Sequence, residues 1–217
     1  MREKRNARPR SADGGWTGAE HAVFAALDSP AAIQAFLDSV PYSTDPIYRC
    51  PRSVLRDRRA HCFDGAVLAA AALRRLGRRP LLLDMRAVRD DDHVIALFRR
   101  GRHWGAVAKS NFAPLRYREP IFRTLRELVL SYFEFFFSIV SKKTLRSYSL
   151  PVDLAAFDAQ HWALRDETMD VIARRLDRAR HVPLLTPAMV RGLELVDART
   201  YQAAMLGVDP AGLYRPQ

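Results

Sequence analysis

The segment that most constrains this chain is the alanine- and leucine-rich run from Cys62 to Leu76, which Gly77 follows directly. A helix that is apolar almost all round has to be buried, and a glycine just after the last turn is a typical helix C-cap. The next segment, Leu81 to Met85, shows no alternation of polar and apolar residues, which is typical of a strand buried on both faces. We therefore expect a buried central helix that packs against a sheet.

The residues that follow are expected to continue this sheet as a meander. Asp90 to Asp92 read as a turn, His93 to Phe98 as a second strand and His103 to Lys109 as a third, with Gly101 in the hairpin between them. This order predicts an α+β fold in which a central helix packs on a small antiparallel sheet. Additional helices are expected at the C-terminal end.

Three regions are expected along the chain. Residues 1–15 are polar and basic and are predicted to be a disordered arm, residues 16–150 the main domain, and residues 151–217 a helical C-terminal extension. Within these regions Thr17 and Glu20 match a helix capping box. Further helices are predicted over the ranges Pro30–Val40, Ile121–Phe137, Glu167–Arg180 and, in pieces, Pro187–Met205, with a strand or loop over Ser141–Leu150.

The composition excludes several classes of protein. The net charge is +11, but only four of the 35 basic residues are lysines, the arginines are spread along the chain, and no aromatic-interleaved motif accompanies them, so nucleic-acid binding is not favoured. The longest apolar stretches are far short of ~20 residues, so no membrane span is expected.

No apolar segment follows the charged N-terminus, which predicts a cytoplasmic protein. The chain has two cysteines and neither a CxxC nor an HExxH motif, so neither a metal nor a cofactor is expected.

Three residues suggest nucleophilic catalysis. Cys62 stands at the expected N-terminus of the buried helix, where free N–H groups and the positive helix end stabilise a thiolate. His93 opens the second strand and can act as the base, and Asn111 follows the third strand and can orient the imidazole. The start of one antiparallel strand faces the end of the next, so His93 and Asn111 are expected to be neighbours. The order Cys, His, Asn satisfies the nucleophile–base–orienter requirement.

The same residues resemble a known family. The segment His61-Cys62-Phe63-Asp64-Gly65-Ala66, the helix up to Gly77, and Asp92-His93 followed by a third polar residue are similar to the transglutaminase-like superfamily, including bacterial proteins with such a domain. The resemblance covers about residues 50–115 and implies a papain-like α+β fold. It also implies that Cys62 is the nucleophile, His93 the general base and Asn111 the orienter, although aspartate is more usual there. The chain departs from the pattern at Val94, where an aromatic residue often follows the histidine, and at Ala60-His61, where glycine and tryptophan often precede the cysteine.

Each of these residues also has a purely structural interpretation. A cysteine in an alanine- and leucine-rich helix is often a small core residue, His93 can be an ordinary strand histidine, and Asn111 a turn residue. Asp84 is a rival orienter, but it precedes the histidine in the chain. Trp104, Arg116 and Arg118 are predicted to line the substrate cleft and to bind a carboxylate or phosphate there, unless the two arginines are simply solvated.

Two functions are consistent with these residues. The first is thiol-dependent acyl transfer or amide hydrolysis by a Cys62–His93–Asn111 triad, with a peptide or amide as substrate. The acyl group passes to water in a peptidase or amidase and to an amine in a transferase. The alternative is a catalytically inactive protein of the same fold that binds an acidic protein partner through its arginine-rich surface.

Overall fold

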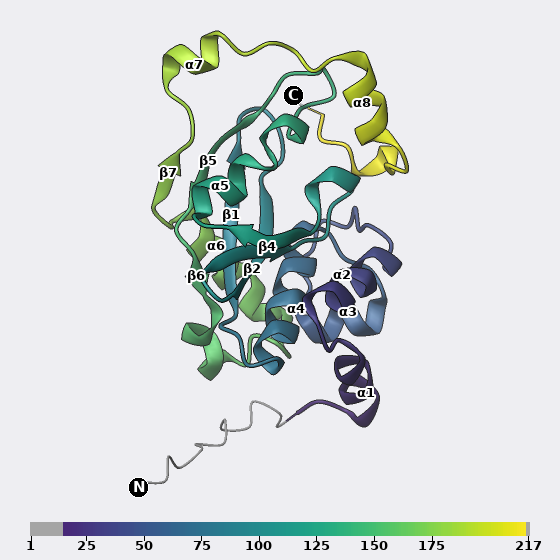
Figure 1. Cartoon of the computed structure of the whole chain (residues 1–217). Coiled ribbons are helices and arrows are strands. Elements are labelled where there is room, and N and C mark those ends of the chain that lie inside the picture. The colour runs from purple at the N-terminus through teal and green to yellow at the C-terminus, as the bar shows by residue number, and fades with distance from the viewer. Residues whose placement is uncertain (1–14, 216–217) are drawn as a thin grey trace, which may run out of the picture.

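The computed structural model describes residues 15–215, and its centre is one antiparallel sheet (Figure 1). The strand order in that part of the chain is β4-β3-β2-β1-β5-β7, and β6 pairs with β1 beside this path. The strands are β1 (Leu81–Ala87), β2 (His93–Arg100), β3 (His103–Val107), β4 (Arg118–Phe122), β5 (Leu145–Ser149), β6 (Val152–Asp153) and β7 (His181–Pro183).

The helices cover the two faces and the ends of this sheet. The α-helices are α1 (Gly18–Ala26), α2 (Pro30–Ser39), α3 (Pro51–Asp57), α4 (Cys62–Arg75), α5 (Leu125–Leu130), α6 (Met169–Asp177), α7 (Pro187–Arg191) and α8 (Ala198–Met205). The 3-10 turns are η1 (Ala113–Leu115), η2 (Phe133–Phe135), η3 (Leu154–Gln160), η4 (Asp166–Thr168) and η5 (Pro210–Gly212). In Figure 1, α7 and α8 lie at the end of the molecule opposite α1.

The central helix α4 is confirmed. Every residue from Phe63 to Leu73 is buried, because α2 and α3 pack on it from one side and β2 from the other. His61 and Asp64 form a capping box at its start, and Gly77 takes a positive φ of 75° just after its end. The expected α+β fold, a central helix on an antiparallel sheet, is therefore the observed one.

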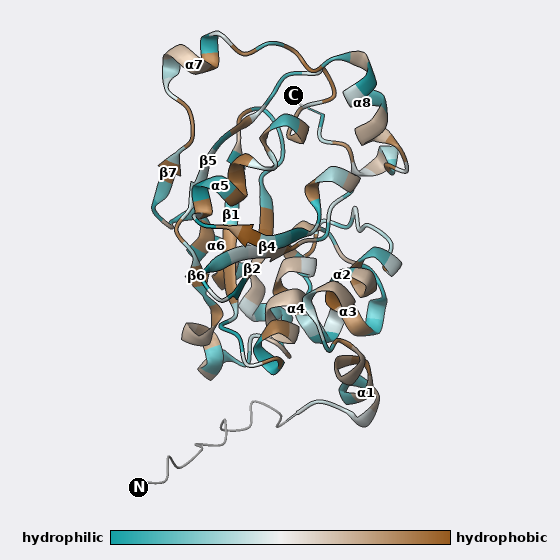
Figure 2. Cartoon of the chain, viewed as in Figure 1, coloured by the Kyte–Doolittle hydropathy of each residue, from teal (hydrophilic) through white to brown (hydrophobic). Residues whose placement is uncertain are grey.

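The sheet separates two hydrophobic cores. The core on the α4 side contains Val94 and Ala96 of β2, whereas the core on the α5 side contains Ile95 and Leu97. Adjacent residues of a strand point to opposite faces, so a strand that enters both cores has to be apolar along its length. That is the reason for the unbroken apolar runs of β1 and β2, which stand out in the hydropathy colouring of Figure 2.

The helix predicted over Ile121–Phe137 is wrong. Residues Arg118–Phe122 instead form β4, which pairs with β3 at the edge of the sheet. Pro120 has no N–H, and it is tolerated there because an edge strand does not need every N–H for pairing with a neighbouring strand. The helix is only α5, Leu125–Leu130, and Thr124 caps it by accepting a hydrogen bond from the Glu127 N–H at 3.1 Å.

The region 151–217 contains strands as well as the expected helices. β6 pairs with β1 and β7 with β5, so these strands extend the central sheet. Ile172 and Leu176 of α6 belong to the core on the α4 side. The predicted helix over Glu167–Arg180 is the shorter α6, and Pro187–Met205 divides into α7 and α8. The predicted arm at residues 1–15 lies outside the described residues apart from Gly15.

Candidate active site

Cys62 is the first residue of α4, as predicted, and it borders a cavity. Its Sγ lies 3.9 Å from the Asp92 carbonyl oxygen. Burial raises the pKa of the thiol to about 12, although the N–H groups of Val94 and Phe63 point to the sulfur and oppose this shift. Asp91 and Asp64 raise the pKa further by repelling a negative charge. The thiol is therefore neutral in this structure.

His93 is the first residue of β2 and is only 5% exposed. Its Nε2 lies 2.8 Å from the Leu115 carbonyl oxygen, and the rings of Tyr132 and Phe136 meet the imidazole edge-on. Because a carbonyl oxygen only accepts hydrogen bonds, Nε2 carries the proton and Nδ1 keeps the basic lone pair. Burial lowers the pKa of His93 to about 4, so the ring is neutral at physiological pH.

The two side chains approach the start of β2 from different sides. His93 lies on the face of Ile95, whereas α4 packs on the face of Val94. The Cys62 sulfur is in contact with the main chain of Asp92 and Val94, the two neighbours of His93. Cys62 and His93 also line one small cavity of about 50 Å³. Within the described residues, no hydrogen bond joins the thiol to the imidazole.

Asn111 does not orient His93 in this structure. Its Nδ2 donates to the Asp209 carbonyl oxygen at 2.9 Å, and its Oδ1 accepts from the Asp209 N–H at 2.9 Å. The acceptor that holds the imidazole is the Leu115 carbonyl. The β2–β3 register explains the difference, because the ladder ends at the pair Ala96 and Val107, before Asn111 is reached. Every residue type carries a backbone carbonyl, so no sequence pattern marks this role.

A larger cavity of about 540 Å³ lies on the other side of Cys62. It is strongly acidic for a chain with a net charge of +11, since its lining includes Asp45, Asp84, Asp91, Asp92 and Asp177. Burial and the neighbouring Asp92 raise the pKa of Asp84 to about 6. Asp84, the rival orienter of His93 in the sequence, is instead joined to His181, with Oδ2 and Nε2 3.1 Å apart.

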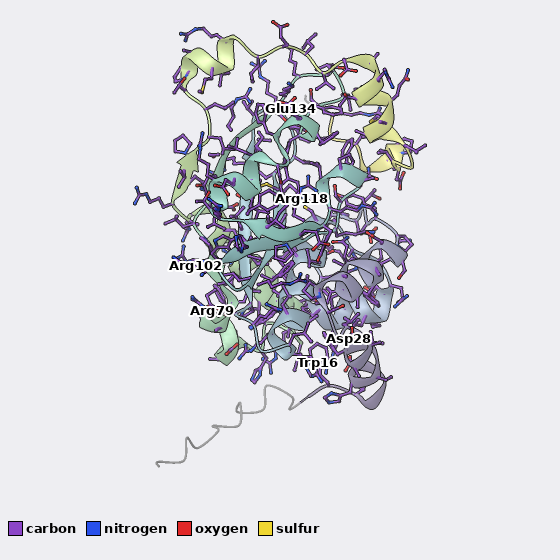
Figure 3. All side chains as sticks on the ribbon, in the orientation of Figure 1. Trp16, Asp28, Arg79, Arg102, Arg118 and Glu134 are labelled. Carbon is purple, nitrogen blue, oxygen red and sulfur yellow. The ribbon has the colours of Figure 1, made fainter. Side chains whose placement is uncertain are left out.

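The three predicted substrate-binding residues lie away from both cavities that Cys62 borders. Trp104 stacks under the Arg99 guanidinium at 4.3 Å, and Arg116 forms an ion pair with Asp38 at 2.9 Å. Arg118, which is labelled in Figure 3, is half-buried, donates to the Ser131 hydroxyl at 2.9 Å and covers the ring of Tyr132. These contacts give Arg116 and Arg118 structural roles.

The second cysteine belongs to a different part of the fold. Cys50 is buried at the start of α3, with its Sγ 3.6 Å from the Ser53 hydroxyl, and burial raises its pKa to about 11. Across residues 15–215, no three His, Cys, Asp or Glu side chains converge to hold a metal ion. No helix in the same range is long and apolar enough to cross a membrane.

Comparison with known proteins leaves the family open. No family model and no curated protein sequence matches this chain. Among solved structures, the chain is similar to Legionella pneumophila LapG (EGTA-treated), with a TM-score of 0.40 and 13% sequence identity over 70% of this chain and 86% of that one. The fold class and the site described above therefore rest on the contacts of this chain.

Proposed function

We propose that this protein catalyses thiol-dependent acyl transfer or amide hydrolysis, with Cys62 as the nucleophile and His93 as the general base. The observation that carries the proposal is that the Cys62 sulfur, at the N-terminus of α4, lies against the main chain on both sides of His93. The Leu115 carbonyl takes the orienting role that Asn111 was expected to fill. This carbonyl fixes the tautomer in which Nδ1 accepts a proton, which is the form that a general base needs.

The proposed reaction requires His93 Nδ1 to reach the Cys62 sulfur across the small cavity that both residues line. His93 Nδ1 takes the proton of the Cys62 thiol while the sulfur attacks the carbonyl carbon of an amide or ester. The N–H groups of Val94 and Phe63, which already point to the sulfur, are the candidate donors for the oxyanion. The imidazolium then gives its proton to the leaving amine or alcohol. Water or a second amine attacks the thioester while His93 takes its proton, and that proton returns to the departing Cys62 thiolate.

One observation favours the alternative, a catalytically inactive protein on the same fold. The thiol and the imidazole are both neutral and are not hydrogen-bonded to each other, which differs from an activated thiolate–imidazolium pair. In that case the arginine-rich surface binds an acidic partner and Cys62 is not needed. The two functions make opposite predictions about the chemistry of Cys62.

Acetylation by p-nitrophenyl acetate distinguishes them. In a Cys50→Ser background we expect Cys62 to be acetylated, as seen by mass spectrometry, and His93→Ala to slow this by about a hundredfold because the general base is lost. His103→Ala is the matched control, since His103 is exposed in β3 and lies outside both cavities. Acetylation at the same rate in His93→Ala and in His103→Ala would reject the enzyme and leave the binding protein.

A further inference from the structure

The contact between Asn111 and Asp209 has the form of main-chain recognition. The two polar atoms of one side-chain amide pair with the N–H and the C=O of a single residue, each at 2.9 Å. In a β-sheet, a neighbouring strand pairs with the N–H and the C=O of one residue in the same way. Such a contact holds one extended residue whatever its side chain is, and the chain then turns into η5, where the Gly212 N–H donates to the same Asp209 carbonyl at 3.0 Å. The bound residue lies 98 positions further along the chain.

The residues after Asp209 fit closely at one point. A Cβ atom added to Gly212 would lie 2.8 Å from Asn111 Nδ2 and 3.0 Å from Tyr42 Cδ1. Real side chains do not approach this closely without displacement of a neighbour. The space between Asn111 and Tyr42 therefore favours a glycine, because a larger residue would have to displace the Asn111 amide that holds Asp209.

This segment lies at Cys62. Gly212, Leu213 and Tyr214 line both the small cavity that contains His93 and the large acidic cavity. Arg215, the last described residue, borders the acidic cavity, so a basic side chain of the segment is placed beside several carboxyl groups. The segment thus covers the approach to the proposed nucleophile from the solvent side.

The segment is held by few contacts. Asp209, Pro210 and Ala211 are exposed, and Gly212 and Leu213 are only half-buried. The helix before it, α8, is anchored separately, since the Tyr201 hydroxyl donates to the Ile139 carbonyl at 3.2 Å and its ring packs on Phe137. A peripheral segment with little buried apolar surface opens at low free energy. It can therefore leave the site while α8 stays in place.

We propose that Asp209–Arg215 occupies in cis a polypeptide-binding groove beside Cys62, in which Asn111 binds the main chain and Tyr42 selects a glycine. The ligand class of the groove is a peptide whose residue held by Asn111 is extended and is followed by a 3-10 turn, as in Pro210–Gly212, with a glycine at the third position after it. A peptide ligand gains access only when the cis segment leaves. The inference deepens the proposed function and rests on it only for the chemistry that follows binding.

The first experiment opens the groove in the full-length chain. Gly212→Val places a side chain where Asn111 and Tyr42 leave no room and expels the segment, whereas Ala211→Val adds similar bulk at an exposed neighbour and is the matched control. A fluorescein-labelled peptide with the sequence of residues 207–217 is titrated into each protein and followed by anisotropy. We expect Gly212→Val to bind the peptide with a Kd of about 0.1 mM, because a segment tethered at a millimolar effective concentration fills the groove of the wild type only if its own Kd is about tenfold lower than that concentration.

The wild type and Ala211→Val are expected to bind the peptide at least tenfold more weakly than Gly212→Val, since their groove is filled. A peptide that itself carries Gly→Val at the position of Gly212 is expected not to bind to any of the three proteins. Equal binding by all three proteins, or no binding to Gly212→Val at the highest concentration, overturns the inference. Peptide binding needs no reactive thiol, so this outcome is independent of whether acetylation fails.

The second experiment measures whether two substitutions speed or slow the acetylation of Cys62. If Asn111 clamps the segment, Asn111→Ala releases it, and acetylation of Cys62 by p-nitrophenyl acetate rises by about tenfold, the size expected for the loss of two hydrogen bonds. If Asn111 instead supported His93 as in the sequence-based triad, the same change would slow acetylation. Gly212→Val should raise the rate to a similar extent. A fall or no change in both variants contradicts the clamp.

Discussion

The neutral state of His93 makes the stability of the protein depend on pH in a calculable way. The pKa of this histidine is about 4 in the folded chain and about 6.5 when exposed. A lowered pKa means that the native state disfavours the charged ring. The contribution to stability is therefore complete above the unfolded pKa and is lost as the pH falls from 6.5 towards 4.

The size of this effect follows from the two values. Between pH 7 and pH 5 the unfolded chain takes up most of a proton at this site and the folded chain almost none, which corresponds to about 2 kcal/mol of lost stability. His93→Gln removes the titration but keeps an N–H that can donate to the Leu115 carbonyl. Other groups titrate in the same range, including His61, whose pKa burial also lowers to about 4. The difference between the wild type and the variant isolates His93.

The assay is urea unfolding of the wild type and His93→Gln at pH 7 and pH 5, with equal m-values as the check that the same surface is exposed. We expect the wild type to lose about 2 kcal/mol more than the variant over this interval. An imidazole titration followed by NMR should place the pKa of His93 near 4. Parallel losses in the two proteins would refute the burial and the tautomer on which the proposed mechanism depends.

Two further changes test the surroundings of the site. Gly65→Ala should destabilise the protein by about 1–3 kcal/mol in urea unfolding, because the added Cβ would lie 2.3 Å from the Lys109 Cβ. This effect outweighs the normal preference of a helix for alanine over glycine. A more stable variant would show that α4 and Lys109 are not in contact. Asp84→Asn should remove about 3 kcal/mol of pH dependence from the free energy of unfolding. The pKa of the carboxyl is raised to about 6 in the folded chain, so its contribution to stability is complete below the unfolded value of 3.8 and is lost as the pH rises to 6. Identical stability profiles for wild type and variant between pH 4 and pH 7 would contradict this expectation.

The parts of the fold that the sequence could predict are those set by local patterns. The Cys62–Leu76 run and Gly77 predict α4 because hydrophobic burial and helix capping act over a few residues. The unbroken apolar strands predict the meander for the same reason. The apolar positions Leu125, Leu128 and Val129 do lie on a helix, α5. The error at β4 arose because pairing with the edge of β3, and not a local pattern, decides the conformation of Arg118–Phe122.

The candidate site could be predicted only in part, for a similar reason. Cys62 and His93 stand at the predicted element starts, because the boundary of a helix or strand is visible in the sequence. The partner of Asn111 is distant in the chain, and nothing in the segment 207–215 indicates that it returns to the loop after β3. The same is true of the contact between Asp84 and His181, which joins β1 to β7. Tertiary contacts of this kind decide which groups face one another and leave no local pattern.

The protonation state of Cys62 depends more on the contents of the cleft than on its position on α4. The helix N-terminus and the N–H groups of Val94 and Phe63 favour a thiolate, yet burial and the charges of Asp91 and Asp64 outweigh them. Gly212, Leu213 and Tyr214 line both cavities that Cys62 borders, and under the proposed cis occupancy they contribute to that burial. If these residues left as proposed, water would reach the sulfur while the favourable N–H groups stayed in place, so the pKa of the thiol would fall. Under the proposed function, the neutral thiol is the state expected of a covered nucleophile, and exposure of the cleft would be the change that allows His93 to take its proton.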